Sequence, residues 1–119
     1  MDARAVPNPR KQLGDHGEQL AAAWYSERGY RVLVRNWRCR NGELDLVLAR
    51  RDEIVFCEVK TRSSRRFGHP VEAVTRAKQL RIRRLAVMWL KSSGTRSRRL
   101  RFDVAAVEQG MVEVWRDAF

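Results

Sequence analysis

Three consecutive segments of this chain have strand-like patterns, and they lie too close together for helices to connect them. The segments span residues 30–37, 43–49 and 54–61. Asn41-Gly42 stands between the first two, and this dipeptide favours a tight hairpin because both central positions of a type I′ turn need a positive φ. A polar break at 50–53 separates the second segment from the third. Parallel neighbours would need a crossover of a dozen or more residues, so we predict an antiparallel meander.

Helical patterns stand on both sides of this meander. Residues 15–28 place apolar and small side chains on one face, and residues 70–92 form a second pattern, as a short first piece and a long second piece that Thr75 caps. Two further strand patterns, at 101–107 and 111–115, are joined by a Gln-Gly turn. The predicted order is αβββαββ, which indicates an α/β domain with a mixed five-stranded sheet flanked by helices.

The length and composition of the chain fit one folded domain. With 119 residues, of which 44% are hydrophobic, it can bury a core without disulfides or a structural metal. Residues 1–12 contain prolines and basic residues without periodicity, so we predict a mobile basic N-terminal arm and a domain over 13–119.

Cys39 and Cys57 lack a metal-type spacing, which indicates reduced thiols in a cytoplasmic protein. Apolar runs such as 85–90 are far shorter than the ~20 residues of a membrane span, so we expect no membrane contact.

The charge balance points to a polyanionic partner. Lysine and arginine number 25 against 14 aspartates and glutamates, a net charge of +11, which favours nucleic acid. Compositional drift toward arginine is the alternative, and a solvated helix face would account for part of the charge. The side chains predicted to contact phosphates are Arg62, Arg65 and Arg66 in the loop after the third strand, and Lys78, Arg81 and Arg84 on the long helix.

Acidic residues interrupt two of the apolar strands. Alternation places Glu43 and Asp45 on one face of their strand, and Glu58 and Lys60 on one face of theirs. A turn centred at 51–52 would pair Asp45 with Glu58, and opposed carboxylates are destabilising unless a cation lies between them. Carboxylate oxygens, water and phosphate are the ligands that Mg²⁺ prefers. We therefore predict a metal site here, with Lys60 placed to hold or deprotonate an attacking water.

The competing interpretation is a set of salt-bridged acids on an exposed strand. The Asn-Gly turn would place Arg38 opposite Asp45 and Arg40 opposite Glu43, and surface ion pairs of this kind contribute little. A register shift of one residue would also separate Asp45 from Glu58. The apolar neighbours of these acids favour central strands.

An Asp in one strand followed by Glu-x-Lys in the next resembles the motif of the restriction-endonuclease-like nuclease superfamily, written PD-(D/E)xK. This chain has Leu44 at the position of the Pro, which is not a ligand. Several segments together resemble the bacterial YraN-type family, described as predicted nucleases similar to archaeal Holliday-junction resolvases. These segments are Gly17-Glu18, 35–38, 42–45, 56–62, 67–68 and 101–104, within a resemblance that covers 13–119.

The resemblance implies a role for each site residue. Asp45, Glu58 and the Val59 carbonyl would be metal ligands, for Mg²⁺ or for Mn²⁺ in its place. Lys60 would position the nucleophilic water, and Glu18 would complete the metal site. For Glu18 a second interpretation stays open, because Asp15-x-x-Glu18 also fits a capping box at a helix N-terminus.

The expected function is therefore a metal-dependent endonuclease acting on DNA. The similarity to resolvases implies branched or structured DNA, and junction cutting would require two sites and so a homodimer. The superfamily also contains members that bind nucleic acid without cutting it, so a binding module of the same fold is the alternative. A third alternative is a basic protein that binds an acidic protein surface.

Overall fold

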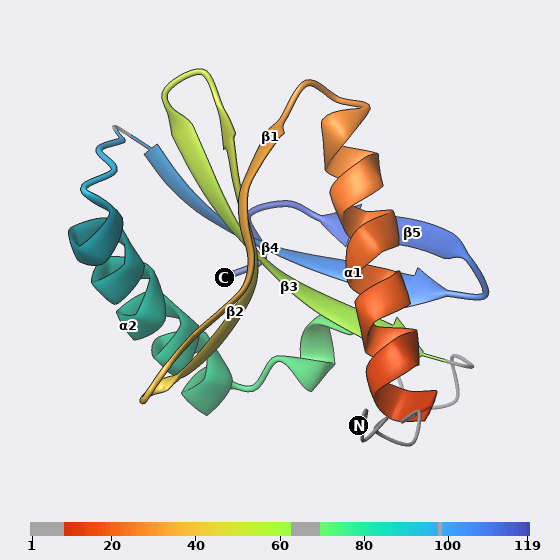
Figure 1. The fold of residues 1–119 in the computed structure, drawn as a ribbon. Helices are drawn as coiled ribbons and strands as arrows, with labels where there is room; N and C mark the ends of the chain where they lie inside the picture. Colours follow the sequence, from red (N-terminus) through yellow and green to blue (C-terminus); the bar gives the residue numbers. More distant parts are fainter. Residues whose placement is uncertain (1–8, 63–69, 98) are drawn as a thin grey trace, which may run out of the picture.

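A computed structural model describes residues 9–62, 70–97 and 99–119, and its elements follow the predicted order (Figure 1). They are α1 (Pro9–Ser26), β1 (Arg31–Cys39), β2 (Gly42–Arg50), β3 (Glu53–Arg62), the 3₁₀-helix η2 (Pro70–Ala73), α2 (Arg76–Ser93), β4 (Arg99–Glu108) and β5 (Met111–Trp115). The strands lie in the order β1-β2-β3-β4-β5. All neighbours are antiparallel except β3 and β4, which are parallel. The mixed five-stranded sheet of a single α/β domain is thereby confirmed.

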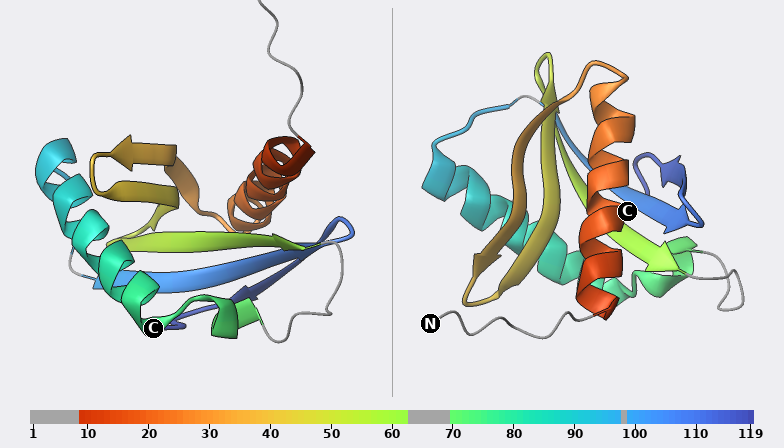
Figure 2. Two further views of the ribbon diagram at one scale, coloured as in Figure 1. Left: turned by 90° about the horizontal axis from the view of Figure 1, so that it is seen from below. Right: turned by 45° about the vertical axis from the view of Figure 1, so that its right-hand side comes forward.

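The two long helices pack against different faces of this sheet. The crossover between the parallel strands β3 and β4 contains η2 and α2, as parallel pairing requires. Figure 2 shows α1 and η2 on opposite sides of β3 and β4 in its left view. Thr75 caps α2 by accepting a hydrogen bond from Lys78 N, and Gly94 ends it in the left-handed region, with φ 68°. No helix in the described ranges is long and apolar enough to cross a membrane.

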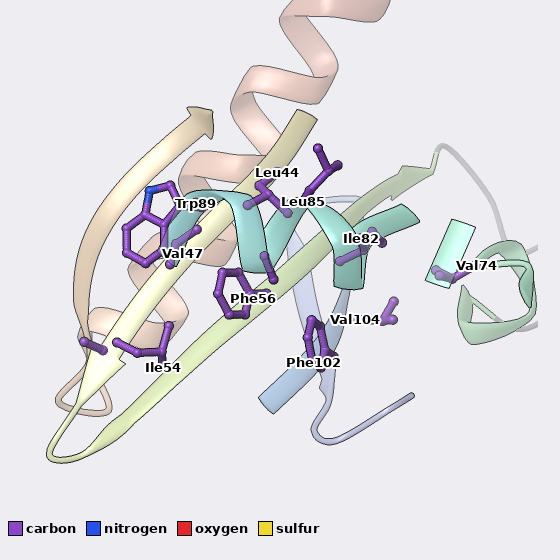
Figure 3. Packing of buried hydrophobic residues seen from close by; sticks show 12 residues of the cluster. Leu44, Val47, Ile54, Phe56, Val74, Ile82, Leu85, Trp89, Phe102 and Val104 are labelled. Atoms are coloured by element: carbon purple, nitrogen blue, oxygen red, sulfur yellow. The ribbon is translucent and has the colours of Figure 1, made fainter. Parts of the chain in front are cut away.

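Aromatic and aliphatic side chains fill the space between the sheet and α2 (Figure 3). The Phe56 ring lies 5.4 Å from that of Phe102 and 6.0 Å from that of Trp89, measured between centroids. Ile82 and Leu85 bring α2 into the same cluster. Each fully buried side chain of this size stabilises the fold by about 1.5–3 kcal/mol, so this cluster fixes the position of α2 on the sheet.

A second core lies under α1 and contains a buried polar network. Asp103 is completely buried in it, and its carboxylate accepts hydrogen bonds from Tyr25 Oη at 2.6 Å and from Asp117 N at 2.9 Å. Arg101 contacts the same carboxylate through Nε and Nη2, and through Nη1 it contacts Glu53. Burial and the Asp103 carboxylate raise the pKa of Tyr25. The network connects α1, β3, β4 and the C-terminal segment.

Helix α1 begins earlier than the sequence pattern predicts. Residues 9–12, which were predicted to belong to an N-terminal arm, form its first turn. Pro9 is favourable there because an N–H at the first helical position has no partner within the helix, so proline loses no hydrogen bond. Residues 1–8 lie outside the described part of the chain. Asp15 therefore lies inside the helix instead of at its N-cap. The capping-box interpretation of Glu18 is wrong for this reason.

The first hairpin also differs from its prediction. Arg38 pairs with Glu43 instead of Asp45, because the two turn residues are Arg40 and Asn41 instead of Asn41-Gly42. Gly42 is the first residue of β2 and has a φ of 142°. A Cβ at this position would lie 3.2 Å from Leu85 Cδ1, so glycine also lets the hairpin approach α2.

Gly17 allows the close approach of α1 to β3, and its replacement tests this packing. A Cβ on Gly17 would overlap Thr61 Oγ1 and lie 3.2 Å from Thr61 Cβ. We expect Gly17→Ala to lower the free energy of unfolding by about 1–3 kcal/mol in urea denaturation, as overpacking does. Gly14→Ala is the matched control, because nothing lies within 4 Å of its Cβ position and alanine favours the helix. Adding Thr61→Ala to Gly17→Ala should restore stability, and a loss that persists would contradict this account.

Candidate active site

The predicted pairing of the two acidic strands is confirmed. Arg50 pairs with Glu53 across a turn at 51–52, and the ladder between β2 and β3 ends at Leu46 and Cys57. The next residues on the two strands are Asp45 and Glu58. Beyond the ladder, Asp45 Oδ2 accepts a hydrogen bond from Val59 N at 2.8 Å, so the carboxylate continues the contact between the strands. Figure 1 shows the end of β3 and the N-terminal parts of α1 and α2 in the lower half of the molecule.

Asp45 and Glu58 form a pair of carboxyl groups that repel each other when both are ionised. Burial raises the pKa of Asp45 to about 8, together with the hydrogen bond to Glu58 and its negative charge, although the hydrogen bond from Val59 N acts in the opposite direction. The Glu58 side chain is itself only 10% exposed. A proton or a cation is therefore needed to stabilise this pair, as the like-charge argument predicts.

Glu18 lies across a cavity from this pair. It is buried on α1, and its Oε2 atom has no hydrogen-bond partner among the described residues. Burial raises its pKa to about 7, and the charges of Asp45 and Glu43 act in the same direction. A cavity of about 370 Å³ is lined by Glu18, Asp45, Glu58, Val59, Lys60 and neighbouring residues of α1 and β3. An unpaired buried acceptor at such a cavity is suited to a cation or a bound water.

Two lysines provide positive charge beside the carboxylates. Burial and the neighbouring ammonium group of Lys78 lower the pKa of Lys60. Lys78 reaches the site from α2, with its Nζ 3.8 Å from Glu58 Oε2. A second cavity, of about 250 Å³, lies on this side and is lined by Asp45, Glu58, Lys78, Arg81 and residues of the first hairpin and α2. The carboxylate pair therefore borders two cavities.

The donors present fit a divalent ion that keeps part of its hydration shell. No three Asp, Glu, His or Cys side chains in residues 9–62, 70–97 and 99–119 are grouped closely enough to hold a metal by themselves. Asp45 and Glu58 could supply two carboxylates, and Glu18 could contribute through water. Two carboxylates with water and phosphate is a common environment for Mg²⁺, whereas structural zinc sites need four protein ligands.

The residues predicted to bind nucleic acid have different environments. Arg81 and Arg84 are exposed on α2, and Lys78 is paired with Glu58, so that it belongs to the site itself. Arg62 ends β3, two residues after Lys60. Arg65 and Arg66 lie outside the described residues. The contact of Lys78 with Glu58 was not predicted from the sequence, because nothing in the spacing of α2 and β3 indicates it.

The raised pKa of Asp45 predicts a pH-dependent stability in the absence of divalent ions. The folded protein holds a proton that the unfolded chain releases near its ordinary pKa of 3.8. The stabilisation that this proton provides is fully present below pH 3.8. It is lost as the pH rises toward 8, and the free energy of unfolding falls by at most about 1.4 kcal/mol per pH unit for this one group. We expect Asp45→Asn to stabilise the protein relative to the parent more at pH 8 than at pH 5. Unfolding in urea with EDTA measures this, and parallel curves for the two proteins would contradict it.

The chain has relatives that share this site region. The family model described as "Uncharacterised protein family UPF0102" matches residues 17–107, which include Glu18, Asp45, Glu58, Lys60 and Lys78. A UPF0102 protein of Rhodococcus jostii is 52% identical over 112 residues, covering 90% of this chain and 95% of the relative. UPF0102 proteins of Beutenbergia cavernae and Moorella thermoacetica are each 53% identical, covering 80% and 82% of both chains respectively.

Proposed function

This chain belongs to the UPF0102 family, and we propose that it is a metal-dependent nuclease that hydrolyses phosphodiester bonds in DNA. The observation that carries the proposal is the partly buried pair Asp45 and Glu58, with Lys60 two residues along β3 and the unpaired oxygen of Glu18 at the same cavity. Ionised carboxylates that lie close together and partly buried destabilise the fold unless a cation or a proton neutralises them. Perturbed carboxyl groups in a cavity are typical of functional sites.

Each residue has a distinct role in this proposal. A bound Mg²⁺ or Mn²⁺ would neutralise charge on the phosphate and lower the pKa of a bound water. Asp45 and Glu58 would hold the ion, with the Val59 carbonyl beside them, and the hydrogen bond from Val59 N fixes the orientation of the Asp45 carboxylate. Lys60 would orient the attacking water, and its lowered pKa favours a proton-accepting role.

The charge of the chain supports a nucleic-acid substrate. The net charge is +11, and Arg81 and Arg84 are exposed on the helix that also brings Lys78 to the site. These side chains would contact phosphates on either side of the scissile bond. The resemblance to the resolvases and to the PD-(D/E)xK superfamily extends the proposal to branched DNA. A symmetric dimer would then supply the two sites that junction cutting needs.

A second candidate is a nucleic-acid-binding module that does not cut. The contact between Lys78 and Glu58 favours it, because a lysine can neutralise Glu58 without a metal. Substitutions at the site distinguish the two functions, since cleavage depends on the carboxylates and binding depends on the distributed arginines.

We expect three substitutions to abolish cleavage in different ways. Asp45→Asn and Glu58→Gln remove a ligand charge at nearly constant shape, so both metal affinity and cleavage should be lost. Lys60→Ala keeps the carboxylates, so the metal should still bind while cleavage falls by roughly 100-fold or more, as loss of a positioned catalytic group does. The measurement is cleavage of single-stranded, duplex, flap and four-way DNA with Mg²⁺ or Mn²⁺, beside a binding assay.

Two outcomes would contradict the nuclease proposal. If the parent cuts none of these substrates but binds them as well as the variants do, the binding module takes its place. If the variants cut as fast as the parent, the activity belongs to another site or to a contaminant.

DNA binding should depend strongly on salt. For a protein making about four phosphate contacts, affinity falls roughly 100-fold between about 50 and 200 mM salt. We expect Arg81→Glu and Arg84→Glu to weaken binding and to reduce this salt dependence. Arg96→Glu is the control, because Arg96 is exposed beyond the C-terminal end of α2, whereas Lys78 lies in its first turn. Fluorescence anisotropy measures both effects, and an affinity that does not change with salt would argue against a nucleic-acid partner.

A further inference from the structure

We propose that Lys78 is the resident counter-ion of Glu58 in the metal-free protein and that a divalent ion must displace it to bind. This inference rests on the proposed function, because it concerns the same metal site. It assigns to Lys78 a positioning role that couples metal binding to the contact with nucleic acid.

The geometry around Glu58 carries the inference. Lys78 Nζ lies 3.8 Å from Glu58 Oε2, and the two side chains are 31% and 10% exposed, so the pair is partly shielded from solvent. Asp45 and Glu58 are neighbours. Lys60 and Lys78 are also neighbours, and their positive charges repel each other. Two cations and two carboxylates therefore share one small region. A divalent ion between Asp45 and Glu58 would supply the positive charge that Lys78 now provides, and it would repel the nearby ammonium group.

The second cavity shows where Lys78 can move. Lys78, Arg81 and Glu58 line this cavity of about 250 Å³, on the α2 side of the carboxylates, whereas Glu18 and Lys60 line the cavity on the α1 side. A metal bound by Asp45 and Glu58 would take the Glu58 carboxylate from Lys78, whose side chain would stay on the α2 side with Arg81. Lys78, released from Glu58, would then face a phosphate together with Arg81. Metal binding would thus add one phosphate contact to those that the distributed arginines make.

Calorimetric titration with Mn²⁺ alone tests the exchange without measuring activity. We expect Lys78→Gln to bind Mn²⁺ about three- to tenfold more tightly than the parent, because the ion no longer has to displace a partly buried partner. Lys78→Arg keeps the positive charge and should remain close to the parent. Arg81→Gln is the matched control, since it removes one positive charge from the same cavity, and its Mn²⁺ affinity should change by less than about twofold.

The results separate this inference from the proposed function. If the parent binds Mn²⁺ and Lys78→Gln binds it no more tightly, or if Arg81→Gln tightens binding equally, then Lys78 is not a specific competitor and the inference fails alone. If neither the parent nor any variant binds Mn²⁺, the metal site fails and the inference fails with it.

A second measurement follows the Lys78 amine directly. Acetylation of individual lysines in the full-length protein, measured by peptide mass spectrometry, should become faster at Lys78 when Mn²⁺ is saturating. Lys91 is exposed in the last turn of α2, and its rate should stay constant. An unchanged rate at Lys78 under saturating Mn²⁺ would show that the pair with Glu58 persists, which overturns the exchange.

Discussion

The contact between the Asp45 carboxylate and the Val59 N–H organises the candidate site. It lies where the ladder between β2 and β3 ends, so a side chain takes over from the backbone as the contact between the strands. Asp45 is thereby held beside Glu58, at the border of two cavities. The orientation of the carboxylate is set by the sheet itself, which is more rigid than a loop. Every role proposed for the neighbouring residues depends on this fixed position.

The mixed sheet explains how distant segments reach the pair. Because β3 and β4 are parallel, the chain must cross over between them, and the crossover brings the first turn of α2, with Lys78, to Glu58 in the middle of β3. On the other face, Gly17 lets α1 lie against Thr61, which brings Glu18 to the same place. Glycine also allows two close approaches, of α1 to Thr61 at Gly17 and of the first hairpin to α2 at Gly42.

The sequence was informative where local rules act alone. Strand alternation and a turn centred at 51–52 predicted the register that pairs Leu46 with Cys57 and so places Asp45 next to Glu58, although a shift of one residue stayed open. The first hairpin was predicted with the wrong register, because a glycine with a positive φ can also stand just after a turn, as Gly42 does beside α2. Lys78 could not be placed at Glu58, because the crossover geometry that joins them is a tertiary property.

The acid in the polar network under α1 and the acids at the candidate site have different partners, and this difference bears on function. Asp103 is completely buried, but Tyr25, Arg101 and the Asp117 N–H satisfy its carboxylate, so it stabilises the fold without further partners. The acids near β2 and β3 are different, because Glu18 keeps an unpaired oxygen and Asp45 faces another carboxyl group. A buried polar atom without a partner costs stability, and so does a pair of carboxylates that repel each other. The cation proposed above would supply the partner that the Glu18 oxygen lacks and would reduce the repulsion between Asp45 and Glu58.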